Sequence, residues 1–147
     1  MIKSQLISNI NMKIYFISFL ICFLFLIIVD ALWLGLIAKN FYSLRIGHLM
    51  SSSFKFWPAF IFYPLYTLAL VLLVIWPAIE GGQSFSKVFF LGFILGLVAY
   101  GAYDLTNQAV LKDWPIIVTV VDMLWGSLLA GSASLVTYYS VVNYFSL

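Results

Sequence analysis

Three aspartates lie inside long apolar stretches of this chain, where a charged side chain is out of place. Asp30, Asp104 and Asp122 each interrupt an apolar run long enough to cross a bilayer. An ionisable residue in such a run costs a few kcal/mol and is a candidate functional group by default. If the three carboxylates meet, some must be protonated or a cation must neutralise them. They therefore suggest acid–base chemistry or cation binding, and all three are candidate catalytic residues.

A polar stretch from Tyr100 to Asn107 closes the third apolar run. Tyr100, Asp104 and Asn107 would share one face of a helix, because four and then three residues separate them. We expect Asn107 to line a site with the aspartates, and Tyr100, Tyr103 and Thr106 to contact a ligand there. Carboxylate and amide oxygens suit a hard cation. The spacing matches no local metal motif, which leaves any metal or cofactor unidentified.

The same short pattern, D-x-L-W, begins at two of the aspartates. Asp30 opens the segment DALWLG and Asp122 the segment DMLWG, with glycine close behind in both. Residues three apart share a helix face, so the indole N–H groups of Trp33 and Trp125 could orient a partner near each carboxylate. The repeat therefore adds these two tryptophans to the candidate ligand-binding residues.

Composition places the chain in a membrane. Of its 147 residues, 65% are hydrophobic and 8% charged, with a mean hydropathy of +1.12, which excludes a soluble globular domain. A short polar leader, residues 1–12, is expected to precede a single domain, residues 13–147. Four apolar runs, which cover about 14–38, 57–79, 86–110 and 114–144, can each span a bilayer. Their short links predict an all-α integral membrane protein, an antiparallel four-helix transmembrane bundle.

The few charged residues bear on partners and orientation. The net charge of +2 comes from scattered basic residues, which does not favour nucleic acid as a partner. The lipid bilayer is the expected partner, and a homo-oligomer stays open. Three basic residues flank the spans on the side of the termini and four on the other side, so the positive-inside rule barely separates the two orientations. We expect the termini inside the cell, because the first helix usually dominates.

The segment between the first two runs, residues 39–56, mixes apolar and polar residues and suggests a short element lying in the membrane interface. It carries Arg45 and His48, which we place at the mouth of the site. Arg45 could fold back onto the carboxylates, and His48 could act there as an acid or base. Pro64, inside the second run, leaves the Phe60 carbonyl without its helical partner and predicts a kink or a bound polar group.

Four polar residues are expected at one depth in the bilayer. Each lies eight or nine residues from a charged residue at the same end of its run: Asp30 from Lys39, Tyr63 from Lys55, Asp104 from Lys112 and Asp122 from Asp113. At a rise of about 1.5 Å per residue, all four reach one level roughly 12–14 Å below those charges. This predicts a polar layer, off-centre in the membrane, to which Tyr63 contributes as a ligand-binding residue.

Three hypotheses for function follow. The first is a membrane-embedded binding or acid–base catalytic pocket for a lipid-like small molecule, with its polar head near the interface and its tail between helices. The second is a small proton- or cation-coupled transporter or channel, because ionisable groups in spans often mark ion paths. The third is a structural or assembly subunit, in which the polar residues only make interhelical hydrogen bonds of about 0.6 kcal/mol each. Whether the protein is an enzyme stays open.

Four motifs, taken together and in order, resemble a known family. They are D-x-x-W-L-G at Asp30–Gly35, P-A-x-x-x-Y at Pro58–Tyr63, Y-D-L-T-N at Tyr103–Asn107 and W-P-x-x-V-T-x-x-D-x-x-W-G at Trp114–Gly126. From about Tyr15 to the C-terminus the chain resembles a bacterial four-span membrane family of unknown function, the one numbered twenty-one seventy-seven among such domains. The resemblance implies a bacterial inner-membrane location and a four-span bundle, and it brings no activity with it.

Overall fold

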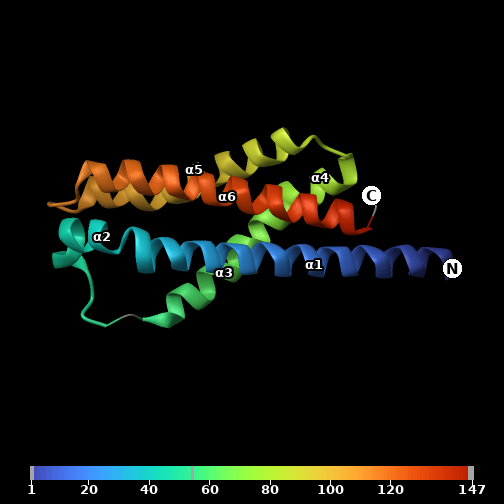
Figure 1. The fold of residues 1–147 in the computed structure, drawn as a ribbon, viewed down its shortest axis with the longest axis horizontal. Coiled ribbons are helices and arrows are strands. Elements are labelled where there is room, and N and C mark those ends of the chain that lie inside the picture. The colour runs from blue at the N-terminus through green and yellow to red at the C-terminus, as the bar shows by residue number, and fades with distance from the viewer. Residues whose placement is uncertain (1, 54, 146–147) are drawn as a thin grey trace.

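The fold is built from long helices, which a computed structural model describes over residues 2–53 and 55–145 (Figure 1). In chain order the elements are α1 (Ile2–Leu32), the π-helical turn η1 (Trp33–Ile37), α2 (Lys39–Ile46), the 3-10 turn η2 (Gly47–Leu49), α3 (Phe56–Leu70), the π-helical turn η3 (Val71–Ile75), α4 (Trp76–Gly81), α5 (Phe85–Val110) and α6 (Ile116–Phe145). The element α1 continues into η1, and α3, η3 and α4 follow one another without a break. The chain therefore has four long helical segments, with α2 and η2 as a short link between the first two.

Each long segment is apolar and long enough to cross a membrane. The four candidate spans are Asn11–Ile37, Phe56–Gly81, Phe85–Val110 and Ile116–Phe145. The expected all-α, multi-pass membrane bundle is confirmed, and the expected limits of the spans differ from these by about three residues at most. The segment expected as a polar leader is helical from Ile2 onward. Extending a formed helix adds one hydrogen bond for each residue fixed, which favours this continuation.

The helix α6 is the centre of the arrangement. It packs against α5 in the most extensive contact of the fold, and it also contacts α1. Figure 1 shows α5 and α6 side by side and antiparallel, with α1 lying along α6 and α3 crossing α1 obliquely. The link formed by α2 lies at the same end of the bundle as the short turn at Lys112–Asp113 that joins α5 to α6.

Glycine allows α5 and α6 to approach closely. A side chain added at Gly92 would come within 2.8 Å of the Ala130 carbonyl oxygen, and one at Gly96 would collide with the Gly126 carbonyl. In a membrane such small residues let helix backbones pack tightly and gain van der Waals contact. This pair of helices therefore forms the rigid side of the bundle.

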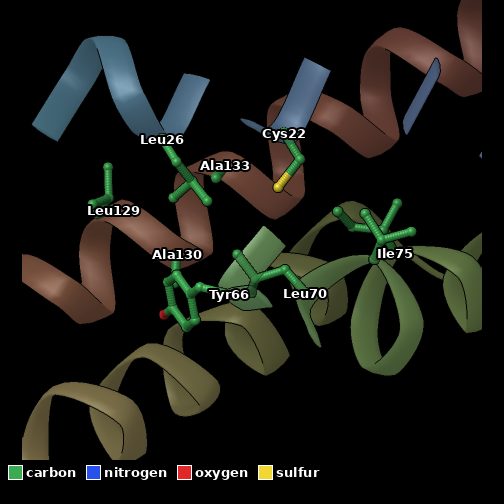
Figure 2. Close-up of a cluster of buried hydrophobic side chains, with 9 residues drawn as sticks. Cys22, Leu26, Tyr66, Leu70, Ile75, Leu129, Ala130 and Ala133 are labelled. Carbon is green, nitrogen blue, oxygen red and sulfur yellow. The ribbon is translucent and has the colours of Figure 1, made fainter. Parts of the chain in front are cut away.

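A second packing centre joins α1, the α3–η3 segment and α6. Figure 2 shows its side chains pointing toward one another from these helices, and the full cluster is Cys22, Leu26, Tyr66, Leu70, Val71, Ile75, Leu129, Ala130 and Ala133. All nine are buried. The cluster holds α1 and α3 against α6 in the middle of the membrane, away from the polar end described below.

Two π-helical turns interrupt the regular helices. In η1 the N–H of Ala38 donates to the carbonyl of Trp33, five residues back, over 2.7 Å. In η3 the N–H of Trp76 donates to the carbonyl of Val71, immediately before Pro77, which has no N–H to continue the helix. The element α3 continues through Pro64, where a kink was expected. Hydrogen bonding departs from the α pattern further along, at η3. Such turns are frequent at functional sites, and η1 begins at one of the candidate tryptophans.

Candidate functional site

A cavity of about 520 Å³ opens between the end of α1, the link α2, and the facing parts of α5 and α6. We call it the acidic cavity. Its lining residues are Asp30, Leu34, Lys39, Tyr42, Ser43, Ile46, Met50, Tyr100, Tyr103, Asp122, and Trp125. Two of the three aspartates expected to meet, Asp30 and Asp122, are therefore brought to one space.

The carboxylate of Asp30 is held by two aromatic side chains from other helices. The indole N–H of Trp125 on α6 donates to Oδ1 over 2.9 Å, and the hydroxyl of Tyr63 on α3 donates to Oδ2 over 2.6 Å. Asp30 is 5% exposed, so both bonds lie in a poorly hydrated setting where hydrogen bonds to a carboxylate are strong. The two bonds fix the carboxylate in place and tie α1 to α3 and α6.

The carboxylate of Asp122 is reached by a chain of donors that starts on η1. The indole N–H of Trp33 donates to the hydroxyl oxygen of Tyr42 over 3.2 Å, and that hydroxyl donates to Oδ1 of Asp122. Burial raises the pKa of Tyr42 above its ordinary value, and the hydrogen bond to Asp122 raises it further. The phenol therefore stays protonated, and its role is that of a hydrogen-bond donor.

The two D-x-L-W segments meet through their tryptophans. The rings of Trp33 and Trp125 stack with their centroids 4.2 Å apart and their planes within 9° of parallel. Each indole serves the aspartate of the other segment: Trp125 donates directly to Asp30, and Trp33 reaches Asp122 through Tyr42. The repeat is thus used as a crossed pair at the contact between two antiparallel helices.

The link α2 forms the roof of the acidic cavity. Lys39, Tyr42, Ser43 and Ile46 all line it, and their spacing of three, four and seven residues places them on one helix face. Tyr42 also packs with Trp114 and other apolar residues at the start of α6, in a cluster made of Ala38, Tyr42, Trp114 and Val118 with Trp33, Phe41 and Ile46 around it. The roof is therefore attached to α6 by apolar contacts as well as by the bond to Asp122.

Tyr42 and Lys39 were not among the residues predicted for the site. The i, i+3, i+4, i+7 pattern from Lys39 to Ile46 was the signal available in the sequence. It lies in the segment expected to rest in the interface, where polar and apolar faces are also expected. Tyr42 lies close to Asp122 through a contact between residues 80 apart in the chain, which no local pattern reveals.

The third aspartate lies apart from the acidic cavity. Asp104 is fully buried, and within the described part of the chain neither of its carboxylate oxygens has a hydrogen-bond partner. It is absent from the cavity lining, although Tyr100 and Tyr103 on the same helix are present. One turn before it, Gly101 faces the Met123 side chain of α6, so this part of α5 packs closely on α6. Asp104 is therefore buried beside a close contact of the two helices and outside the lining of the open space.

The other predicted residues divide in the same way. Asn107, which was expected to line the site with the aspartates, is half-buried and does not line the cavity. Thr106 is exposed, and its hydroxyl donates within its own helix to the carbonyls of Ala102 and Tyr103. A hydroxyl that is already bonded to its helix adds little to a distant site.

The residues expected at the mouth of the site are replaced by Lys39. The guanidinium of Arg45 donates to the Phe41 carbonyl over 3.2 Å and lies 4.1 Å from the centroid of the Phe41 ring. His48 is exposed in η2, and neither it nor Arg45 lines the acidic cavity. Lys39 is the basic side chain that does, because the turn of η1 directs the face of α2 that carries it toward the cavity.

The three-aspartate cation site considered above is not formed. Over residues 2–53 and 55–145, no three His, Cys, Asp or Glu side chains gather in a way that could hold a metal ion. Asp104 is fully buried and does not line the cavity that Asp30 and Asp122 share. The chemistry available at the cavity is therefore that of two carboxylates, a lysine and aromatic donors.

Two apolar depressions adjoin the acidic cavity. The α1–α3 groove, about 440 Å³, is lined by Ile27, Ala31, Leu34, Phe56, Ala59, Phe60 and Tyr63. The α3–α5 recess, about 210 Å³, is lined by Phe62, Ala99, Tyr100 and Tyr103. Leu34 is shared between the groove and the cavity, and Tyr100 and Tyr103 are shared between the recess and the cavity. The polar space is thus bordered by apolar surface on both sides of α3.

Comparison with known proteins identifies one match. Residues 15–139 match the family described as "Predicted membrane protein (DUF2177)". No curated protein and no solved structure matches the chain.

Proposed function

The chain belongs to the DUF2177 family of predicted membrane proteins, and on that premise we propose that it binds the cationic head of a lipid-like small molecule in the acidic cavity. Contact with the bilayer gives such a molecule direct access to the bundle. We further propose that the membrane is the inner membrane of a bacterium. The observation that carries the proposal is the placing of two carboxylates, Asp30 and Asp122, on one cavity beside apolar surface.

The donors around these carboxylates orient them without neutralising them. Tyr63, Trp125 and Tyr42 are uncharged hydrogen-bond donors. The cavity lining holds two acidic side chains and one basic side chain, Lys39. Charges taken out of water need an opposite charge close by. A ligand with a positively charged group supplies this opposite charge. Each carboxylate accepts several hydrogen bonds, so it can accept from the ligand as well as from the tyrosine and tryptophan donors.

The same groups fit acid–base work on the bound head. Asp122 and Asp30 can accept or return a proton where the head lies within hydrogen-bond reach. Trp33 and Trp125 hold the geometry, and Tyr42 stays a donor because its pKa is raised by burial and by Asp122. A pocket that binds without reaction would need the same residues, so the first test concerns binding.

The test uses dodecylamine, a single-chain amine, titrated into the protein in phosphatidylcholine nanodiscs. Asp122→Asn keeps the side-chain size and an oxygen for Tyr42, and removes the negative charge. Loss of one charged hydrogen bond of about 1.5–3 kcal/mol should weaken dodecylamine binding by about tenfold or more. Dodecanol, which has the same chain and no charge, should bind weakly to both proteins.

The matched control is Asp113→Asn, the same chemical change at an exposed aspartate in the turn between α5 and α6. It should bind dodecylamine as the wild-type protein does. Equal binding by wild type, Asp122→Asn and Asp113→Asn would overturn the proposal. If the protein in liposomes instead conducts protons or cations through a path that Asp122→Asn blocks, with no binding of dodecylamine, the transporter hypothesis takes its place.

A further inference from the structure

The acidic cavity shares lining residues with both of its apolar neighbours. Leu34 forms a wall of both the α1–α3 groove and the cavity. Tyr63 lines that groove while its hydroxyl donates to Asp30 in the cavity. On the other side of α3, Tyr100 and Tyr103 join the cavity to the α3–α5 recess. A polar head in the cavity would therefore have an apolar path on either side.

Two adjacent residues of α3 separate these two paths. Phe62 lines the α3–α5 recess and Tyr63 lines the α1–α3 groove. The start of α3 thus lies between the two apolar spaces, so one acyl chain of a lipid could occupy each of them. Because bilayer tails are as apolar as these surfaces, the chains gain little from leaving the bilayer. The grooves would orient the lipid, and discrimination must come from its head.

The lining of the cavity carries charges of both signs. Lys39 and Ser43 lie one turn apart on the same face of α2, and Asp30 and Asp122 come from α1 and α6. An ammonium and a hydroxyl suit a phosphate, and the two carboxylates suit a cation. The cavity therefore offers both charges of a zwitterionic head.

Hydrogen-bonding capacity selects the kind of cation. Tyr42 donates to Oδ1 of Asp122, and no other described residue donates to its Oδ2. A primary ammonium carries three N–H donors, enough to reach Asp122 and the remaining lone pairs of Asp30. A quaternary ammonium has no N–H, and its recognition relies on aromatic faces. The carboxylates of this cavity accept N–H donors, which only the primary amine offers, so a primary amine fits them better.

We propose that the lipid-like molecule is a glycerophospholipid with a phosphoethanolamine head. Its amine lies at Asp122 and Asp30, its phosphate at Lys39 and Ser43, one chain in the α1–α3 groove and the other in the α3–α5 recess. This inference rests on the proposed function, because it specifies the ligand of the same cavity.

The experiment measures binding of four probes to the detergent-solubilised protein by native mass spectrometry. They are dioctanoyl-phosphatidylethanolamine, dioctanoyl-phosphatidylcholine, dioctanoyl-phosphatidylglycerol and dodecylamine. The phosphatidylethanolamine should bind about tenfold more tightly than either other phospholipid, because only it combines a primary amine with a phosphate. Lys39→Gln removes the ammonium group from the cavity lining and should weaken phosphatidylethanolamine binding by about fivefold. Dodecylamine has no phosphate and should bind at least as tightly as to the wild-type protein, because a positive charge near its amine is gone.

The groove is tested separately. Ala59→Trp fills the α1–α3 groove and should weaken phosphatidylethanolamine binding. Ala102→Trp is the control, because Ala102 is exposed on α5 and lines none of the three spaces. Thermal unfolding of both variants checks that the fold is retained. The Lys39→Gln measurement decides the phosphate contact even if Ala59→Trp does not fold.

The outcomes separate this inference from the proposed function. If dodecylamine binds as tightly as phosphatidylethanolamine and Lys39→Gln does not weaken phosphatidylethanolamine, the phospholipid assignment is overturned while the proposal of an amine-binding cavity stands. If phosphatidylcholine or phosphatidylglycerol binds as tightly as phosphatidylethanolamine, the primary amine is overturned. If neither amine probe binds, both proposals fail.

Discussion

The indole N–H of Trp125 on α6 donates to the Asp30 carboxylate on α1 over 2.9 Å, across a separation of 95 residues in the chain. The ring of Trp125 also stacks on Trp33, which belongs to the same short segment as Asp30. One side chain therefore orients a buried carboxylate and packs the two antiparallel helices together. This contact is the central structural element of the acidic cavity.

Trp125→Phe isolates the hydrogen bond, because phenylalanine keeps an aromatic ring against Trp33 and removes only the N–H donor. The buried Oδ1 of Asp30 is then left without that partner, which should destabilise the protein by about 1–3 kcal/mol. The measurement is unfolding in detergent followed by circular dichroism. Trp57→Phe, at a tryptophan that is 66% exposed, is the control and should change stability by less than about 0.5 kcal/mol. Equal effects of the two changes would show that the bond contributes nothing particular.

Tyr42→Phe removes the donor that ties the roof of the cavity to Asp122. The apolar contacts of Tyr42 with Trp114 and Val118 remain, so the fold should persist while α2 opens more often. Hydrogen–deuterium exchange should rise by about fivefold or more in residues 39–49 and stay unchanged in α5, because a lost hydrogen bond of about 1 kcal/mol corresponds to that factor. Tyr139→Phe, at an exposed tyrosine of α6, is the control. An unchanged exchange rate in residues 39–49 would mean that the apolar cluster alone holds the roof.

Asp104→Asn should leave stability unchanged or raise it, in contrast to changes at Asp30. The Asp104 carboxylate is fully buried and has no hydrogen-bond partner among the described residues. Such a group is costly when ionised, and asparagine removes that cost at nearly the same size. Dodecylamine binding should stay within about twofold of wild type, because Asp104 does not line the cavity. Thermal unfolding and the binding titration check both statements, and a loss of binding as large as that of Asp122→Asn would place Asp104 in the site after all.

Gly96→Ala tests the close contact of α5 with α6. The added methyl group would collide with the Gly126 carbonyl, so the helices must separate, at a cost of about 1–3 kcal/mol. Gly35→Ala is a matched control, because a methyl group there has no neighbour within 4 Å. Unfolding by a graded mixture of denaturing and mild detergents compares the two variants. If Gly96→Ala unfolded at the same detergent composition as Gly35→Ala, α5 and α6 would be less closely packed than described.

The fold could be predicted from the sequence further than the site could. Four apolar runs of spanning length predict the four helices. Counting residues from flanking charges predicts one level for Asp30, Tyr63, Asp104 and Asp122; in the structure Tyr63 bonds to Asp30, and Asp30 and Asp122 line one cavity. The depth of a residue along a helix follows from the rise per residue. The direction in which its side chain points depends on how the neighbouring helices are rotated and how closely they approach. Asp104 is buried and does not line the cavity, although it lies one turn after Tyr100, which does.

The roof of the cavity shows a second limit of prediction from the sequence. The bond of Tyr42 to Asp122 depends on the turn η1, where the chain leaves α1 and redirects the following helix. Apolar periodicity locates a helix, and it does not report the angle at which one helix follows another. The crossed use of the two D-x-L-W segments has the same origin, because each donor acts on a residue brought near it by tertiary contact.

The separation of 95 residues between Asp30 and Trp125 also has a consequence for synthesis of the protein. At about 5–20 residues per second, the ribosome completes Trp125 roughly 5–20 s after Asp30. During that interval α1 holds an aspartate whose indole partner does not yet exist, and the first donor to be made is Tyr63 on α3. Translation of α6 therefore completes the cavity, and a nascent chain arrested before α6 would leave Asp30 without its indole partner.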